Sequence, residues 1–230
     1  MATTIKQPTI STAISEGWQK AKSNYSVLIL SLLVLAGIST AFSLLRSFPN
    51  LISLIFKDSS GVAVFTFIVF ALISPLLFVA EMAVNNLTAI GFTKIQLNLL
   101  DGKKAQVSDL FKTNGLFWQY LATSLLVGLI VFGGLLLLIV PGIIWFLKYQ
   151  YAPILIIDKK LDITEAIRTS GEITKGHKGW LFGFAIVMGL INIAGALALI
   201  VGLLFTIPIT IMAYIYVYRQ FSAGVKSSKA

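Results

Sequence analysis

The strongest chemical signal in the sequence is a single lysine, Lys148, inside the apolar segment 143–157. A charged side chain within a membrane span is costly unless it pairs with an opposite charge or reaches water. Lys148 therefore either contacts an anionic solute or a lipid phosphate, or it fixes helix packing by reaching the membrane surface or pairing with a carboxylate. Glu81 and Asp158 are the carboxylates that the sequence offers as partners.

Other polar residues lie in or beside the apolar segments. Asn85 and Asn86 follow Glu81 along a predicted helix, and amides in such positions either form interhelical hydrogen bonds or bind a ligand. The only histidine, His177, is expected at the membrane surface. The candidate ligand-binding or packing residues are Lys148, Glu81, Asn85, Asn86, Asp158, Arg168, Ser170 and His177.

Several kinds of chemistry have no residues to support them. The chain has no cysteine, which excludes disulfides, thiolate nucleophiles and cysteine metal sites. No metal-ligand spacing, phosphate-binding loop or catalytic triad is present. The sequence therefore predicts no enzymatic activity, and it indicates no catalytic residue, no cofactor and no metal site.

The composition predicts an all-α, polytopic integral membrane protein that forms a single membrane domain. The chain is 57% hydrophobic and 12% charged, whereas soluble domains carry about 25% charged residues. A hydrocarbon core of about 30 Å needs roughly 20 apolar residues in a helix. Six predicted spans follow, at 26–45, 62–80 (with the helix continuing to 100), 116–140, 143–157, 181–200 and 203–218.

Breaks and small residues organise these spans. Arg46, with the proline and asparagine that follow, is predicted to end the first span, which leaves a loop at 46–61. Pro141 and Gly142 are predicted to break the chain between the third and fourth spans. Gly179 and Gly183 form a GxxxG pattern, which is typical of close helix packing or of dimerisation.

Three amphipathic segments are predicted as interfacial helices, at 10–22, 107–114 and 163–174. Ser11 or Thr12 is expected to cap the first of them and Ser108 the second. Each segment precedes an odd-numbered span, so the chain either repeats a unit of one surface helix and one hairpin three times, or the likeness is common to interfacial helices in general.

The distribution of charge predicts the orientation. Of the 18 basic residues, all except Arg46, Lys57 and Lys148 fall in the tails or in segments 81–116 and 158–179. The positive-inside rule then places both termini in the cytoplasm, in a multi-pass cell (inner or plasma) membrane protein. The net charge of +9 indicates anionic lipids at the cytoplasmic face rather than nucleic acid, because no nucleic-acid recognition motif accompanies it.

The segment from Pro141 to Gly176 resembles a family of bacterial and archaeal membrane domains of unknown function. Its members occur alone or as the membrane portion of some glycerophosphoryl diester phosphodiesterases. The matching features are Pro141-Gly142, Lys148, Ala152-Pro153, Asp158, Ala166-Ile167-Arg168-Thr169-Ser170 and Thr174-Lys175-Gly176, followed by Tyr218-Arg219. The resemblance implies a six-span helical fold in which Pro141, Gly142, Pro153 and Gly176 are structural. It implies no reaction, because the phosphodiesterase chemistry belongs to a separate soluble domain that this chain lacks.

Two functional hypotheses remain open. The first is a non-enzymatic module that binds lipid, a membrane protein partner or a second copy of itself. The second is a small permease or exporter for an amphiphilic or anionic solute, which the intramembrane lysine and the prolines within the spans favour.

Overall fold

The computed structural model describes residues 7–55, 60–198 and 201–225, and within these ranges every regular element is a helix. The predicted all-α class is therefore confirmed. The elements are α1 (Ile10–Lys22), α2 (Tyr25–Ile55), α3 (Ser60–Leu100), the 3₁₀ helix η1 (Val107–Phe111), α4 (Phe117–Leu137), α5 (Ile139–Tyr149), α6 (Ala152–Lys159), α7 (Ile163–Ile173), α8 (Lys178–Leu197) and α9 (Leu203–Phe221).

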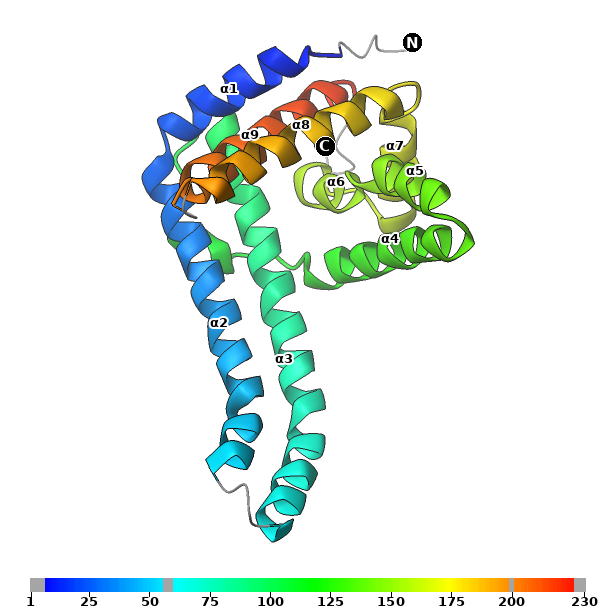
Figure 1. Cartoon of the computed structure of the whole chain (residues 1–230). Helices are drawn as coiled ribbons and strands as arrows, with labels where there is room; N and C mark the ends of the chain where they lie inside the picture. Colours follow the sequence, from blue (N-terminus) through cyan, green and yellow to red (C-terminus); the bar gives the residue numbers. More distant parts are fainter. Residues whose placement is uncertain (1–6, 56–59, 199–200, 226–230) are drawn as a thin grey trace.

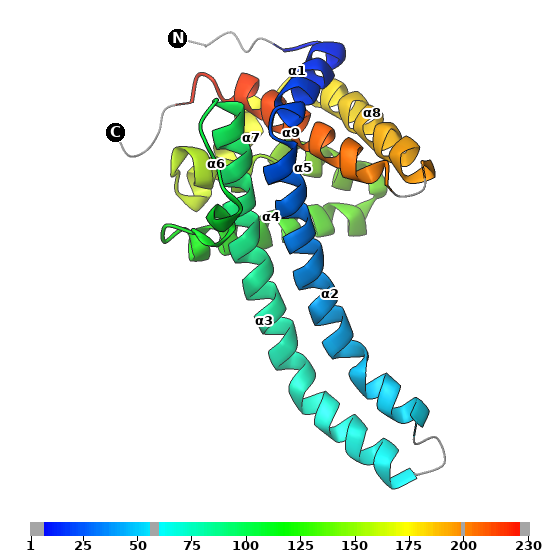
Figure 2. The same cartoon turned by 90° about the vertical axis from the view of Figure 1, so that its left-hand side faces the viewer.

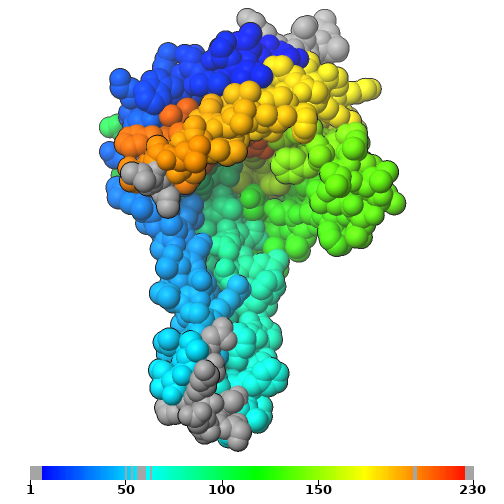
Figure 3. All heavy atoms as spheres, viewed as in Figure 1, coloured from blue at the N-terminus to red at the C-terminus, as the bar shows by residue number. Residues whose placement is uncertain are grey.

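A long helical hairpin, α2 and α3, extends from a compact group formed by the other helices (Figures 1 and 2). Helix α3 has 41 residues, so it is about 60 Å long, twice the thickness of a hydrocarbon core. Its first half exposes large apolar side chains, whereas its second half is buried against other helices. Figure 3 shows the resulting stalk and head.

The prediction of a loop that begins at Arg46 is wrong. Helix α2 continues through Arg46 and Pro49 to Ile55, so the part of 46–61 that the structure describes is helical rather than a loop. The apolar residues Leu51 and Leu54 extend the helical pattern beyond the proline, and both are more than half exposed, as expected of side chains that face lipid. This extension matters because it carries Arg46 alongside α3.

Helix α9 is the centre of the compact group. Most of its side chains beyond Pro208 are buried, and α1 lies along it (Figure 1). A Cβ atom at Gly17 of α1 would lie 2.7 Å from both the amide nitrogen of Ala213 and the carbonyl oxygen of Ile209. Small residues on one face of α1 therefore let the two backbones touch.

Two predicted helix caps are wrong, although α1 and η1 begin at the predicted residues, Ile10 and Val107. Thr9, not Ser11 or Thr12, caps α1, and its Oγ1 accepts from the amide of Thr12 at 3.1 Å. In the segment predicted as a helix at 107–114, η1 ends at Phe111, and Gln106 and Asp109 form a capping box in place of Ser108.

The break between the third and fourth predicted spans falls at Leu138 rather than at Pro141. Proline is tolerated in the first turn of a helix because the amide there has no intrahelical partner, and Pro141 occupies the third position of α5. The sharp reversal instead depends on glycine. A Cβ at Gly134 would lie 2.9 Å from the Cα of Gly142 and 2.7 Å from the indole of Trp145.

Among the residues that the structure describes, the GxxxG pattern mediates no close packing. A Cβ at Gly179 or at Gly183 would meet no atom within 4 Å. The close approach of α8 to α9 occurs instead at Gly195, where a Cβ would lie 2.4 Å from the hydroxyl of Thr206.

Among the described residues, five helical segments are long and apolar enough to cross a membrane. They are Tyr25–Pro49, Val64–Leu100, Phe117–Leu137, Ile139–Lys159 and Lys178–Leu197. The sixth predicted span, 203–218, is helical as part of α9 but is not among the five. These long apolar helices are compatible with a membrane protein.

Candidate functional site

The site around Lys148 is built on a break between two helices. Pro153 is the second residue of α6 and has no amide hydrogen, so α5 ends at Tyr149. The carbonyl oxygen of Lys148 accepts a hydrogen bond from the hydroxyl of Ser170 at 2.9 Å. The hydroxyl of Thr174 lies 3.2 Å from the same oxygen and 2.8 Å from the carbonyl oxygen of Ser170. Both hydroxyl residues belong to the α7 region and are fully buried. The broken end of α5 thus holds α7 in place.

The side chain of Lys148 extends over α7 rather than into the interior of a span. A Cβ at Gly171 would lie 3.0 Å from the Cε of Lys148, so the absence of a side chain there leaves room for the lysine stem. The ammonium lies 4.8 Å from the ring centroid of Tyr149, within the range of a cation–π contact.

Neither predicted carboxylate partner of Lys148 contacts it. Glu81 pairs with Arg46 of α2, and Asp158 pairs with Arg219 of α9. Each carboxylate pairs with an arginine on another helix. The sequence did not indicate these pairs, because they depend on how separate helices pack.

Lys148 instead lies in a groove of about 610 Å³ between α5, α7 and the first turn of α8. This basic groove is lined by Lys148, Tyr149, Thr164, Ile167, Arg168, Gly171, Glu172, Lys175 and Lys178. Four cations and one carboxylate give it a net charge of +3. Glu172 compensates little, because its contact with Arg168 is 3.8 Å long and their side chains are 64% and 70% exposed.

The basic groove has the features that bind phosphate. Three lysines and one arginine converge on one surface, and arginine can engage two oxygens of a phosphate at once. Ile167, the stem of Lys148 and the ring of Tyr149 give the groove an apolar component next to its charges. The arrangement suits a molecule with an anionic group and an apolar body.

Gly176, from the family pattern, and the candidate residue His177 both have structural positions at the start of α8. Gly176 adopts a φ of 83°, a left-handed conformation that favours glycine, at the turn between α7 and α8. Nδ1 of His177 lies 2.6 Å from Oε1 of Gln7, and the imidazole stacks on the ring of Phe221 at 5.2 Å. His177 therefore joins the start of α8 to the N-terminal segment and to α9.

Asp158, near the end of α6, belongs to a separate polar network. It accepts hydrogen bonds from the Tyr218 hydroxyl at 2.8 Å and from Nη1 of Arg219 at 2.9 and 2.8 Å. Nη2 of Arg219 also donates to Asp101 at 2.6 Å. The ends of α3, α6 and α9 meet in this network, which gives Asp158 a structural position away from Lys148.

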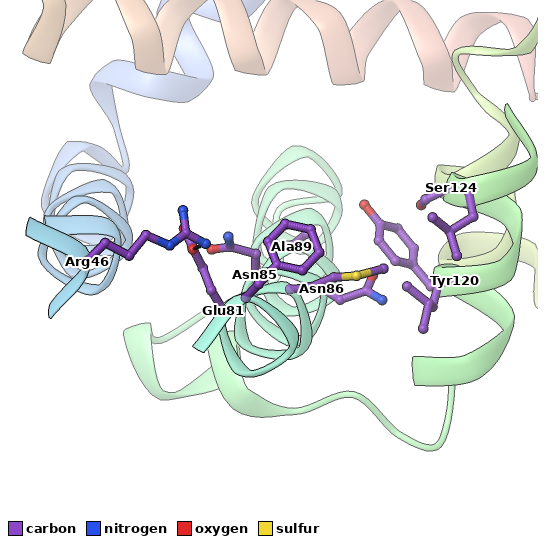
Figure 4. Close-up of a pocket in the computed structure, with 11 residues that line it drawn as sticks. Arg46, Glu81, Asn85, Asn86, Ala89, Tyr120 and Ser124 are labelled. Atoms are coloured by element: carbon purple, nitrogen blue, oxygen red, sulfur yellow. Dashed lines mark ion pairs between the residues drawn. The ribbon is translucent and has the colours of Figure 1, made fainter. Parts of the chain in front are cut away.

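A second site, the polar pocket, lies between α2, α3 and α4 and has a volume of about 470 Å³ (Figure 4). It is lined by Arg46, Phe78, Glu81, Met82, Asn85, Asn86, Ala89, Tyr120, Leu121, Ser124 and Leu125. Arg46 and Glu81 form an ion pair at one side of it. Three of the candidate residues, Glu81, Asn85 and Asn86, are therefore together, but apart from Lys148.

Sequence reasoning missed several residues of these two sites. Lys178 shares the basic groove with Lys175, and their spacing of three residues was the available signal. Tyr120 and Ser124 share one face of α4 with a spacing of four. Nothing in the local sequence indicated that Arg46 faces Glu81, because that pairing requires α2 to continue past Arg46.

The chain is similar to mycobacterial proteins whose function is not known. It is 29% identical over 133 residues to the uncharacterized protein Rv2560 of Mycobacterium tuberculosis, and equally to Mb2590 of Mycobacterium bovis. The match covers 56% of this chain and 39% of each relative, so the chain spans about two fifths of the length of these relatives. No family model matches the chain. No solved structure matches it either.

Proposed function

We propose that this chain is a non-enzymatic module of the cell membrane that binds the phosphate group of anionic lipids at its cytoplasmic face. The basic groove is the observation that carries the proposal, because four cations and a single carboxylate line one groove beside apolar helices. A lipid phosphate would lie among the charges, with its acyl chains along the exposed apolar side chains of α5 and α8.

The membrane arrangement that we propose has six spans in three hairpins. α1, η1 and α7 precede the hairpins α2–α3, α4–α5/α6 and α8–α9 respectively. The positive-inside rule then places α7 and both termini on the cytoplasmic side. The chain has no native cysteine, so a single cysteine reports its own position. A Ser108→Cys variant is expected to react with a membrane-impermeant maleimide only after the cells are opened; labelling of intact cells would overturn the orientation.

The family resemblance supports this function in one respect. Lys148, Arg168 and Lys175, the three basic residues of the 141–176 pattern, all line the basic groove. We propose that the chain is related to the membrane domain found in some glycerophosphoryl diester phosphodiesterases and that the groove is the shared feature.

Lipid binding can be measured by native mass spectrometry of the detergent-solubilised protein with added phosphatidylglycerol or phosphatidylcholine. Each well-placed basic residue contributes about 1 kcal/mol, so a K148Q/K175Q double variant is expected to bind phosphatidylglycerol about 30-fold more weakly. The control is K103Q/K104Q, which removes the same charge from exposed positions outside the groove. Equal losses of affinity for phosphatidylglycerol in both variants would show that the lipid is attracted by the overall charge, and would overturn the groove as its binding site.

Competition separates a lipid from a free phosphate. Glycerol phosphate at millimolar concentration is expected to leave phosphatidylglycerol bound, because it lacks the apolar part of the ligand. Displacement of phosphatidylglycerol by glycerol phosphate at micromolar concentration would overturn the proposal of a lipid ligand and would indicate a soluble phosphate compound.

A small permease or exporter is the second candidate, and the ion pair of Arg46 and Glu81 favours it. The two residues lie in two of the segments long enough to span a membrane, and charges within spans often mark solute pathways. Proteoliposomes loaded with carboxyfluorescein, an anionic amphiphile, test this. Efflux equal to that of protein-free vesicles favours the binding module, whereas efflux that an Arg46→Gln variant abolishes favours transport.

A further inference from the structure

The polar pocket between α2, α3 and α4 has a chemistry distinct from that of the basic groove. The charges of Arg46 and Glu81 neutralise each other, and Arg46 also lies 5.9 Å from the ring centroid of Phe78. The polar groups that remain on the lining are the amides of Asn85 and Asn86 and hydroxyls from α4. The pocket therefore offers hydrogen bonds without net charge.

Asn86 contributes an unpaired donor to the lining of the pocket. The residue is only 8% exposed, and its Nδ2 is buried without a hydrogen-bond partner among the described residues. Buried amide donors are almost always paired, because an unpaired one has lost its water without a replacement. Figure 4 shows Asn86 directed from α3 toward α4, where Tyr120 and Ser124 lie. An acceptor oxygen in the pocket would satisfy this donor.

Helical spacing explains why the pocket faces one way. Glu81, Asn85 and Ala89 follow each other at intervals of four on α3, and Tyr120 and Ser124 do so on α4. These two faces oppose each other, and apolar side chains that include Phe78 and Leu125 line the pocket with them. Phe78 is 59% and Leu125 49% exposed, so apolar surface continues outward from the polar groups. An apolar tail could follow that surface out of the pocket.

We infer that the polar pocket binds an uncharged amphiphile whose head group carries ester and hydroxyl oxygens. The Nδ2 of Asn86 would donate to an ester or hydroxyl oxygen, and the hydroxyls of Tyr120 and Ser124 would donate to or accept from the head group. An anionic head group is disfavoured, because Glu81 lies on the lining and already holds the cation of the pocket. This site is separate from the basic groove and does not depend on it.

A photoreactive diacylglycerol tests the inference in nanodiscs that contain the full chain. Mass spectrometry is expected to locate the crosslinks on peptides of α3 and α4. Asn86→Leu, which removes the unpaired donor, and Ala89→Leu, which fills the pocket, are each expected to lower the yield at least fivefold. Gly183→Leu is the control for added bulk, because a Cβ there meets nothing within 4 Å, and it is expected to leave the yield unchanged.

The alternative results are distinct. Thermal unfolding verifies that each variant is folded, and Tyr120→Phe replaces any pocket variant that is not, with an expected loss of at least threefold. Unchanged labelling in the folded pocket variants would overturn the site. Equal labelling of the same peptides by a photoreactive phosphatidylglycerol or phosphatidylethanolamine would overturn the preference for an uncharged head group. Loss of phosphatidylglycerol binding in K148Q/K175Q bears on the basic groove alone, so the two proposals fail separately.

Discussion

Arg219, near the end of α9, donates two hydrogen bonds from Nη1 to the carboxylate of Asp158 at the end of α6, at 2.9 and 2.8 Å. The two side chains are 25% and 12% exposed, so this pair is partly shielded from water. Because Nη2 reaches Asp101 after α3, one guanidinium joins three segments that are far apart in sequence. Arg219 thus holds the ends of α3, α6 and α9 together.

Asp158→Asn is expected to lower the free energy of unfolding by about 2 to 3 kcal/mol. Removing one partner of a shielded ion pair leaves the other charge poorly compensated, and Asp101 would retain only part of the compensation. Reversible unfolding in detergent with increasing SDS measures the loss. Glu172→Gln is the control, since its pair with Arg168 is exposed and contributes about 0.5 kcal/mol or less. Equal losses of unfolding free energy in the two variants would show that the pair of Asp158 and Arg219 does not stabilise the fold.

Gly17→Val is expected to detach α1 from α9. The new Cβ would lie 2.7 Å from backbone atoms of Ile209 and Ala213, and backbone in a buried helix cannot move aside as a flexible side chain can. Overpacking of this kind costs about 1 to 3 kcal/mol. Protease cleavage near Lys20 and Lys22 should then become faster than in the unsubstituted protein. Gly183→Ala is the matched control, and unchanged cleavage in Gly17→Val would show that α1 does not pack as described.

The helical class and the continuous α3 follow from composition and hydropathy, because long apolar helices leave a strong local signal. The break at Leu138 has no such signal. Proline at 141 is compatible with the first turn of a helix, and the reversal depends on contact between Gly134 and Gly142. A pattern read one residue at a time cannot show that contact.

The sequence could predict which residues belong to candidate sites, but not which of them lie together. Lys148 was recognisable as a charge in an apolar segment, yet its neighbours on α7, from Thr164 to Glu172, are 16 to 24 residues further along the chain. The predicted partner Glu81 is taken by Arg46, which local sequence places at the end of a span. Only the packing of α2 on α3 brings this pair together.

Ser170→Ala and Thr174→Val are expected to be more damaging together than the sum of their separate effects. The Ser170 hydroxyl donates to the carbonyl of Lys148, and the Thr174 hydroxyl lies 3.2 Å from the same oxygen and 2.8 Å from the carbonyl oxygen of Ser170. When Ser170 is replaced, the single proton of Thr174 can turn to Lys148, so each single variant leaves that carbonyl one donor. The single losses should be about 1 kcal/mol, and the double variant should add about 1 kcal/mol beyond their sum because a buried carbonyl is then unpaired. A double-mutant cycle of unfolding free energies measures the coupling. Strict additivity would show that the two hydroxyls do not share the acceptor.

The adjacent glycines 133 and 134 are expected to respond in opposite directions to alanine. A Cβ at Gly134 would lie 2.7 Å from the indole of Trp145 and 2.9 Å from the Cα of Gly142, whereas a Cβ at Gly133 would meet nothing within 4 Å. Gly134→Ala should therefore destabilise the α4–α5 reversal by about 1 to 3 kcal/mol. Gly133→Ala should stabilise α4 by up to about 1 kcal/mol, because alanine favours the helix interior. Thermal unfolding in one detergent compares the two directly. A loss at both positions would mean that α4 is packed on a face that is open in this structure, and a gain at both would mean that α4 and α5 do not approach at Gly134.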